Sequence, residues 1–262
     1  MDRVAPWAFA LLLLVAVPWR TAEAAAVSDS LALTYEATLI GLPLATLSAV
    51  VDPRRPYRIT TDLQTRGVVD LFSPWRHHAT AAGRLSADGT AVVGVRYRGD
   101  GVRRSEERYA QLLFEPSQTT VEALKPDLKN AWKGLRVPPE LRHGTFDPLT
   151  AFYILAERLD RGRGCDGPIP IYDGRYRYDL IMSAGPDALS CRFAYRQVAG
   201  FSKRKGRFVD ASPETPGLIR YARVAAGFPP VPERLEVPSR FGSVVVTLTG
   251  WSVETRAAAA SQ

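Results

Sequence analysis

Alternating apolar and polar residues run through most of the chain and predict short, half-buried β-strands. In residues 31–39, Leu31, Leu33 and Tyr35 alternate with threonine and glutamate. Because successive strand side chains point to opposite faces, this period of two places the apolar residues on one buried face. Similar strands are predicted at residues 45–51, 57–63, 76–85, 93–98, 104–114, 120–124, 190–198, 218–226, 234–239 and 244–251, with a short helical turn at residues 68–72. Short strands separated by tight turns are typical of an antiparallel meander.

One segment has the periodicity of a helix instead. Asp147 suits the N-cap, where its carboxylate accepts a backbone N–H, and Pro148 suits the first helical position. Gly162 can end the helix. Apolar residues recur between them at spacings of three and four, on one stripe: Leu149, Phe152, Tyr153, Ala156 and Leu159. We expect a helix over about residues 148–160, with this stripe packed onto the sheet as core and not as a cofactor site.

The segment after this helix predicts a tight β-hairpin. Asp173 and Gly174 can supply the two positive-φ residues of a type I′ turn, which pairs Tyr172 with Arg175. The residues that then share one face are Ile169, Ile171, Tyr176, Tyr178, Leu180 and Met182. A catalytic role for Asp173 is the alternative, but turn formation is the more common role of an aspartate beside a glycine. The pair Asp100-Gly101 predicts another tight turn.

The N-terminus predicts export. Arg3 precedes an unbroken apolar run from Ala8 to Val17, and Ala22-Glu23-Ala24 fits a cleavage site. The run is too short for a membrane-spanning helix, and no later run is longer. We therefore expect residues 1–24 to be a signal peptide, with cleavage after Ala26 or an uncleaved anchor as alternatives, and the mature protein to lie in the periplasm without a transmembrane segment.

The two cysteines, Cys165 and Cys191, fit this compartment. An even number of cysteines in an exported protein indicates a disulfide bond, whose loop would contain the predicted hairpin. Two buried free thiols are the alternative. A metal pair is less favoured, because no histidine lies near either cysteine in the sequence.

Composition and charge predict one globular domain. The chain is 46% hydrophobic, with no internal repeat or linker, so we expect a single antiparallel β domain over residues 25–256 and a disordered tail over residues 257–262. The net charge of +7 comes mostly from arginines along the strands. One dense basic cluster consists of Lys203, Arg204, Lys205 and Arg207. This cluster predicts a loop that contacts anionic lipids or cell-wall polymers, with a solvated loop as the alternative. Nucleic acid is not an expected partner of an exported chain.

No known catalytic, cofactor or phosphate-binding motif is present. His77 and His78 are adjacent on a predicted strand and therefore point to opposite faces, as do Glu106 and Glu107. His143 is isolated. We expect no enzyme activity, no cofactor and no metal site. A hydrolase would need histidines or carboxylates that converge only in the fold.

The helix and hairpin residues resemble a known family. Asp147-Pro148-Leu149-Thr150-Ala151-Phe152-Tyr153, followed by Pro168-Ile169-Pro170-Ile171-Tyr172-Asp173-Gly174-Arg175, is similar to the bacterial exported family described as domain of unknown function 3108. The strand Tyr35-Glu36-Ala37 and the late Gly242-Ser243-Val244 also resemble it, and the cysteines resemble those of an alphaproteobacterial branch. The likeness covers about residues 31–250. Because the family has no established activity, the resemblance implies no functional residue.

These observations predict a mainly β fold, a curved antiparallel sheet or partly open barrel packed on one main helix. This arrangement is similar to that of periplasmic lipoprotein carriers, by fold analogy alone. The leading functional hypothesis is non-enzymatic binding of an apolar or lipid-like ligand between the concave face and the helix. The alternative is a cell-envelope protein–protein interaction module that uses a sheet edge or the basic loop. A filled concave face would contradict the first hypothesis.

Overall fold

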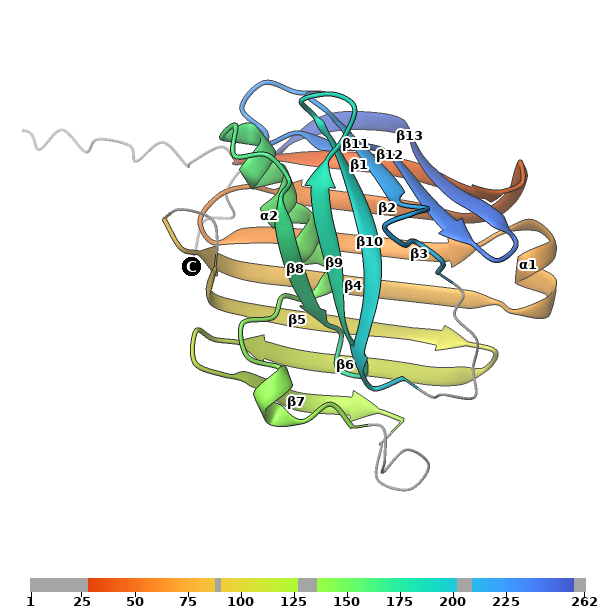
Figure 1. Ribbon diagram of the computed structural model, residues 1–262, viewed down its shortest axis with the longest axis horizontal. Coiled ribbons are helices and arrows are strands. Elements are labelled where there is room, and N and C mark those ends of the chain that lie inside the picture. Colours follow the sequence, from red (N-terminus) through yellow and green to blue (C-terminus); the bar gives the residue numbers. More distant parts are fainter. Residues whose placement is uncertain (1–27, 88–90, 127–135, 202–208, 257–262) are drawn as a thin grey trace, which may run out of the picture.

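The computed structural model describes residues 28–87, 91–126, 136–201 and 209–256 (Figure 1). Within these ranges, thirteen strands form one antiparallel sheet with the order β7-β6-β5-β4-β3-β2-β1-β13-β12-β11-β10-β9-β8. The strands are β1 (Ser28–Leu39), β2 (Leu42–Asp52), β3 (Tyr57–Thr65), β4 (Trp75–Leu85), β5 (Val92–Arg103), β6 (Glu106–Phe114), β7 (Thr119–Lys125), β8 (Gly167–Tyr172), β9 (Arg177–Ala184), β10 (Ser190–Ala199), β11 (Gly217–Ala222), β12 (Val231–Ser239) and β13 (Gly242–Arg256). The helices are α1 (Gly67–Phe72), the short 3₁₀-helix η2 (Pro139–Leu141) and α2 (Pro148–Asp160). The predicted mainly β fold is confirmed, and the sheet is not closed into a barrel.

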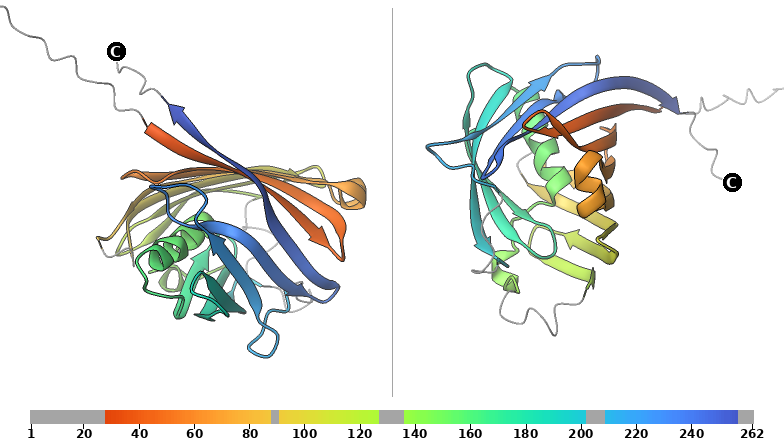
Figure 2. Two further views of the ribbon diagram at one scale, coloured as in Figure 1. Left: turned by 90° about the horizontal axis from the view of Figure 1, so that it is seen from above. Right: turned by 90° about the vertical axis from the view of Figure 1, so that its right-hand side faces the viewer.

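The sheet coils so that its two halves face each other with α2 between them (Figures 1 and 2). The turn between β8 and β9 reaches the opposite end of the sheet, where Gly174 lies against the side chains of Ala110 and Leu124. The guanidinium of Arg175 there donates to the backbone carbonyls of Lys125 and Pro126. These contacts hold the two ends of the sheet together around the helix.

Both ends of α2 agree with the prediction. The Asp147 carboxylate accepts the backbone N–H groups of Leu149 at 2.9 Å and Thr150 at 3.0 Å. At the other end Gly162 has a φ of +67°, and its N–H donates to the Leu159 carbonyl at 3.1 Å. Polar groups that a helix leaves unpaired at its ends are therefore satisfied locally.

The predicted type I′ turn at Asp173-Gly174 is wrong. Tyr172 pairs with Arg177 across the hairpin, so the loop has four residues and not two. Of the two turn residues only Gly174 has a positive φ, and the Asp173 carboxylate accepts the N–H groups of Arg175 at 2.8 Å and Tyr176 at 2.7 Å. These bonds stabilise a wider loop. The register differs from the predicted one by two residues, and a shift of two leaves each strand side chain on the face that was predicted. Tyr176, predicted on a strand, lies in the loop.

The predicted turn at Asp100-Gly101 is also wrong, because both residues lie inside β5. The chain reverses at Arg104 and Ser105, which have φ values of +50° and +64°. Gly101 is needed for a different reason: a Cβ there would lie 2.2 Å from the carbonyl oxygen of Arg76 on the neighbouring strand. Downstream, the strand predicted at residues 218–226 ends at Ala222.

The predicted disulfide is confirmed. Cys165 and Cys191 are bonded, with their Cα atoms 5.7 Å apart, and both are buried. The bond joins the segment after α2 to the start of β10, and its loop contains the β8–β9 hairpin. The predicted signal peptide and the predicted tail lie outside the described residues. In the part of the chain that the structure describes, no helix is long and apolar enough to cross a membrane.

Candidate apolar binding cavity

An apolar cavity of about 220 Å³ lies between α2 and the strands around β1. Its lining side chains are almost all apolar; only Thr61, Arg234 and the tyrosine hydroxyls are polar. The sheet contributes Leu31, Leu33, Tyr35, Leu47, Ala49, Val51, Ile59, Thr61, Arg234, Leu235 and Val246; the helix contributes Leu149, Phe152, Tyr153 and Ala156; and residues 228–232 complete the wall. The concave face of the sheet is therefore not completely filled.

The strand walls follow from the alternating pattern of the sequence. Leu31, Leu33 and Tyr35 on β1 are 0%, 3% and 5% exposed and point to the same face. Leu33 pairs with Ala49 of β2, whose small side chain also lines the cavity. The wall is thus built from residues that a core strand would contain.

Four of the five residues of the helix stripe predicted as core, Leu149, Phe152, Tyr153 and Ala156, also line this cavity. Leu149 and Phe152 are only half-buried, whereas Ile154 and Leu155 are 0% and 1% exposed and belong to the main hydrophobic core. The predicted core role is confirmed for Tyr153, Ala156 and Leu159, which are buried in this core. The stripe was too narrow, because the coiled sheet surrounds α2 and apolar residues are therefore needed on more than one side of the helix. Tyr153, at the edge of the stripe, lies in contact with both regions.

An arginine-rich recess adjoins the cavity and shares Tyr153, Phe228 and Pro229 with it. Its lining includes five arginines and two acids: Arg54, Arg55, Arg84, Arg161, Arg223, Glu157 and Asp160. Arg161 pairs with Glu157 at 2.7 Å, Arg223 pairs with Asp160, and Arg54 pairs with Asp52. No described residue forms an ion pair with Arg55 or Arg84. The recess next to the apolar cavity is therefore positively charged overall.

A buried polar network fixes the first turn of α2 beside the cavity. The Thr150 hydroxyl donates to the Asp147 carboxylate, and the Tyr57 hydroxyl lies 2.5 Å from Thr150 Oγ1. The Tyr57 ring stacks on Tyr153, with centroids 4.5 Å apart. Burial raises the pKa of Asp147 to about 6, although its hydrogen bonds act in the opposite direction, and burial raises the pKa of Tyr57 and Tyr153 above their usual range. The network attaches the helix to β3 and holds one wall of the cavity in place.

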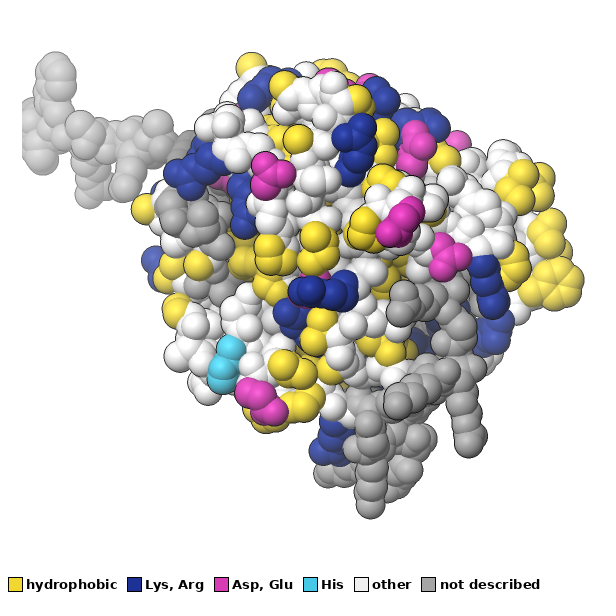
Figure 3. Space-filling model, in the orientation of Figure 1, with side chains coloured by type: hydrophobic (Ala, Val, Ile, Leu, Met, Phe, Trp, Pro, Cys, Tyr) yellow, Lys and Arg dark blue, Asp and Glu magenta, His cyan; other side chains and the backbone are white. Residues whose placement is uncertain are grey.

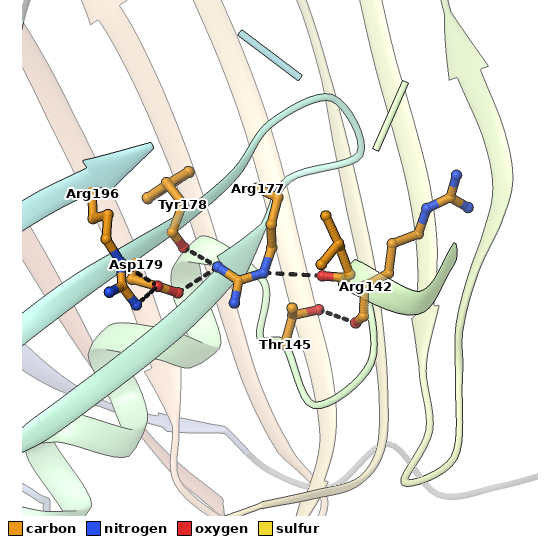
Figure 4. Close-up of polar contacts among 7 residues, drawn as sticks. Arg142, Thr145, Arg177, Tyr178, Asp179 and Arg196 are labelled. Atoms are coloured by element: carbon orange, nitrogen blue, oxygen red, sulfur yellow. Dashed lines mark hydrogen bonds and ion pairs between the residues drawn. The ribbon is translucent and has the colours of Figure 1, made fainter. Parts of the chain in front are cut away.

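A second buried polar cluster was missed by the sequence analysis (Figure 4). Asp179 is 3% exposed and bonds Arg177 Nη1 at 2.5 Å and Arg196 Nη2 at 2.5 Å. Arg177 Nε also donates to the Leu141 carbonyl at 3.0 Å. The sequence places Arg177 and Asp179 on one strand face, but it does not specify that Arg196 lies directly opposite Asp179. This cluster braces β9 and β10 against the segment before α2, and its paired charges offset the desolvation of Asp179.

The other residues singled out in the sequence do not converge on the cavity. His78 contacts Asp62 at 2.7 Å on the strand pair β3–β4, and burial lowers the pKa of the neighbouring His77. Glu106 pairs with Arg108 and Glu107 with Lys125, while His143 is exposed. Among the described residues no group of three or more histidine, cysteine or acidic side chains is placed to hold a metal ion. The basic loop with Lys203, Arg204, Lys205 and Arg207 lies outside the described residues.

The fold and cavity define a class of antiparallel β proteins whose coiled sheet encloses one helix. The model of the family described as "Protein of unknown function (DUF3108)" matches residues 34–249, so the chain belongs to this family, as the resemblance predicted. A solved structure, the beta-barrel-like protein of domain of unknown function DUF1849 from Brucella abortus, is similar with a TM-score of 0.51 and 14% identity. The match covers 87% of this chain and 98% of that one, and at this identity it supports the fold alone. No curated protein matches the chain.

Proposed function

We propose that this protein binds a lipid-like amphiphile without catalysing a reaction, with one apolar chain in the cavity and an anionic end in the arginine-rich recess. The observation that carries this proposal is the unfilled apolar space between α2 and β1–β3. Burial of apolar surface is the main favourable term in such binding. Because the cavity lining has so few polar groups, it favours a hydrocarbon chain without polar groups.

The size of the cavity supports a narrow ligand. Its volume of about 220 Å³ exceeds the roughly 150 Å³ of an engineered cavity that binds benzene, and lies below the roughly 300–1,000 Å³ of typical sites for larger molecules. Each buried methylene contributes about 0.8 kcal/mol. Affinity is therefore expected to increase with chain length until the cavity is full.

The charge of the recess supports an anionic end group. The guanidinium groups of Arg55 and Arg84 have no ion pair among the described residues, and arginine binds carboxylates and phosphates through paired hydrogen bonds. The recess begins where the cavity ends, at Tyr153 and Phe228. A chain in the cavity can therefore place its charged end among the arginines.

Calorimetric titration of delipidated protein tests this proposal. We expect saturable one-to-one binding of dodecanoate, no measurable binding of butyrate and weaker binding of dodecylamine, whose charge is opposite. Absence of saturable dodecanoate binding, or equal binding of dodecylamine, would contradict the proposal.

A variant that fills the cavity tests whether the ligand binds there. Ala49→Leu and Ala156→Leu together introduce methylenes into the lining, and displacing two ligand methylenes weakens binding about 15-fold. The matched control is Ala82→Leu, because Ala82 points to the opposite sheet face from the buried Ala79 and Ala81. If the control weakens binding as much as the filling variant, the ligand lies elsewhere.

We also propose that residues 1–24 direct export to the periplasm. The Cys165–Cys191 bond supports this proposal, because disulfides persist in oxidising compartments. Mass spectrometry of the mature protein from a periplasmic fraction is expected to show an N-terminus at Ala25 or Val27. Full-length protein in the cytoplasm would contradict it.

A further inference from the structure

A group of large apolar side chains is exposed at one end of the molecule, away from the cavity lining. We call it the apolar tip: Ile40, Leu42, Val68, Leu71, Phe72 and Phe241, which are 75%, 67%, 63%, 80%, 77% and 51% exposed. Figure 3 shows apolar side chains projecting at the right-hand end, where Figure 1 places α1. None of the six residues of α1 is buried. The sequence therefore places apolar side chains on a helix that contributes none of them to the core.

Three separate segments bring the tip together. The turn between β1 and β2 holds Ile40 and lies between the other two segments. On one side, Gly67 at the start of α1 packs against Pro43, and the N–H of Arg66 donates to the Leu44 carbonyl at 2.9 Å. On the other side, Ile40 contacts Gly242 at the turn between β12 and β13, next to Phe241. The exposed residues thus form one surface that is continuous in space.

Arginines surround this surface. Arg66 precedes α1, and Arg240 lies over the Phe241 ring with its guanidinium carbon 4.5 Å from the ring centroid. Arg104 donates to the hydroxyl of Ser73, the residue that ends α1, at 3.2 Å. The acid on α1, Asp70, accepts a hydrogen bond from Thr65 at 2.6 Å. The charge beside the tip is therefore mainly positive.

We propose that the apolar tip docks on the surface of a lipid bilayer that contains anionic phospholipids. Leu71, Phe72 and Ile40 enter the boundary between head groups and acyl chains, and the surrounding arginines contact the phosphates. Exposed apolar side chains with basic neighbours are the combination that favours the membrane interface. A second copy of the chain carries the same positive charge at this surface, so its arginines would oppose each other in a symmetric contact. This inference concerns a surface distinct from the cavity and does not depend on the proposed ligand.

Vesicle co-sedimentation tests the docking surface. The probes are phosphatidylcholine vesicles with and without about 30% phosphatidylglycerol, at low salt and at about 0.5 M salt. We expect binding to the anionic vesicles that weakens with salt, and little binding to the neutral ones. Absence of binding to the anionic vesicles overturns the proposal.

Two sets of variants locate the contact. Leu71→Ser with Phe72→Ser is expected to weaken vesicle binding at least about tenfold, because it removes two of the most exposed apolar side chains. The control, Val93→Ser with Val253→Ser, changes two exposed valines, 46% and 44% exposed, outside the tip and is expected to bind as the wild type does. Circular dichroism and urea midpoints identify variants that fail to fold. The variant Arg66→Gln with Arg240→Gln provides an independent test, because its vesicle binding is expected to lose its dependence on salt. Unchanged vesicle binding in the folded tip variants overturns the proposal. The proposal is also overturned if the wild type is a dimer in solution and the tip variants are monomers, because the tip would then be a contact between two copies of the chain.

Discussion

The two sides of α2 face different environments. On one side Ile154 and Leu155 are fully buried in the main core, which includes residues of β4–β6 and β8–β10. On the other side Leu149 and Phe152 border the cavity beside β1 and β2. One face of the helix is therefore packed in the core, and the other borders the cavity proposed to hold the ligand. Changes on the packed side should affect folding, and changes on the cavity side should affect ligand affinity.

The largest expected effect separates the two faces directly. Ile154→Ala is expected to lower the free energy of unfolding by about 3–4 kcal/mol, because it leaves a void among fully buried neighbours. Leu149→Ala is expected to cost only about 1 kcal/mol, since this side chain already borders open space, but it should weaken dodecanoate binding. Urea denaturation and calorimetry check both values. Equal loss of stability in the two variants would contradict the distinction.

Removing the disulfide should destabilise the packed side. Cys165→Ser with Cys191→Ser opens a loop with a sequence separation of 26 residues, for which the chain-entropy model gives about 3.5 kcal/mol. Because neither cysteine lines the cavity, the dodecanoate affinity of the folded variant should remain that of the wild type. The thermal midpoint under reducing and oxidising conditions provides the measurement. A large loss of affinity would show that the two regions are coupled.

The free energy of unfolding should depend on pH through Asp147, which lies at the first turn of α2 between the two regions. Its pKa is raised from 3.8 to about 6 in the folded protein, so between these values the folded state holds a proton that the unfolded chain has released. The stabilisation is fully present below pH 3.8 and is lost as the pH rises through 6. From pH 4 to pH 7 the wild type should lose roughly 2–3 kcal/mol relative to Asp147→Asn, which keeps a capping oxygen but does not titrate. A difference in unfolding free energy that is constant across this range would contradict the burial argument.

The smallest expected effect lies in the recess. Arg55→Gln should weaken dodecanoate binding about three- to tenfold, corresponding to roughly 1 kcal/mol for an exposed ionic contact, and should leave the urea midpoint unchanged. The matched control is Arg58→Gln, because Arg58 is an exposed arginine three residues further along the chain, on β3, that does not line the recess. Equal weakening by both variants would indicate a general effect of charge and not a contact in the recess.

Local sequence signals predicted the helices and strands. The turn lengths and the contacts between distant strands depend on long-range pairing, which local signals do not specify. The helix ends depend on Asp147, Pro148 and Gly162, which act within a few residues of themselves, so α2 was predicted at its observed bounds. The Asp-Gly pairs were misleading because a carboxylate can stabilise a wider loop, as at Asp173, and a glycine can serve close strand contact, as at Gly101.

The cavity could be anticipated only as a hypothesis. Its existence depends on how far α2 lies from β1 and β2, and no local pattern specifies that spacing. Leu33 and Leu149 read as core residues in the sequence, and the structure places both on the cavity wall. The Asp179–Arg196 contact could not be predicted either, because it depends on the register between β9 and β10, which no local pattern specifies.

Isotope-filtered nuclear Overhauser spectroscopy of methyl-labelled protein with unlabelled dodecanoate tests the central claim most directly. If the chain lies between the helix and β1–β2, its methylene protons should show contacts to the methyl groups of Leu33, Leu47 and Leu149, and none to those of Leu112, Ile154 or Ile171 in the packed core. Contacts to the packed core instead, or no contacts at saturating dodecanoate, would contradict the account.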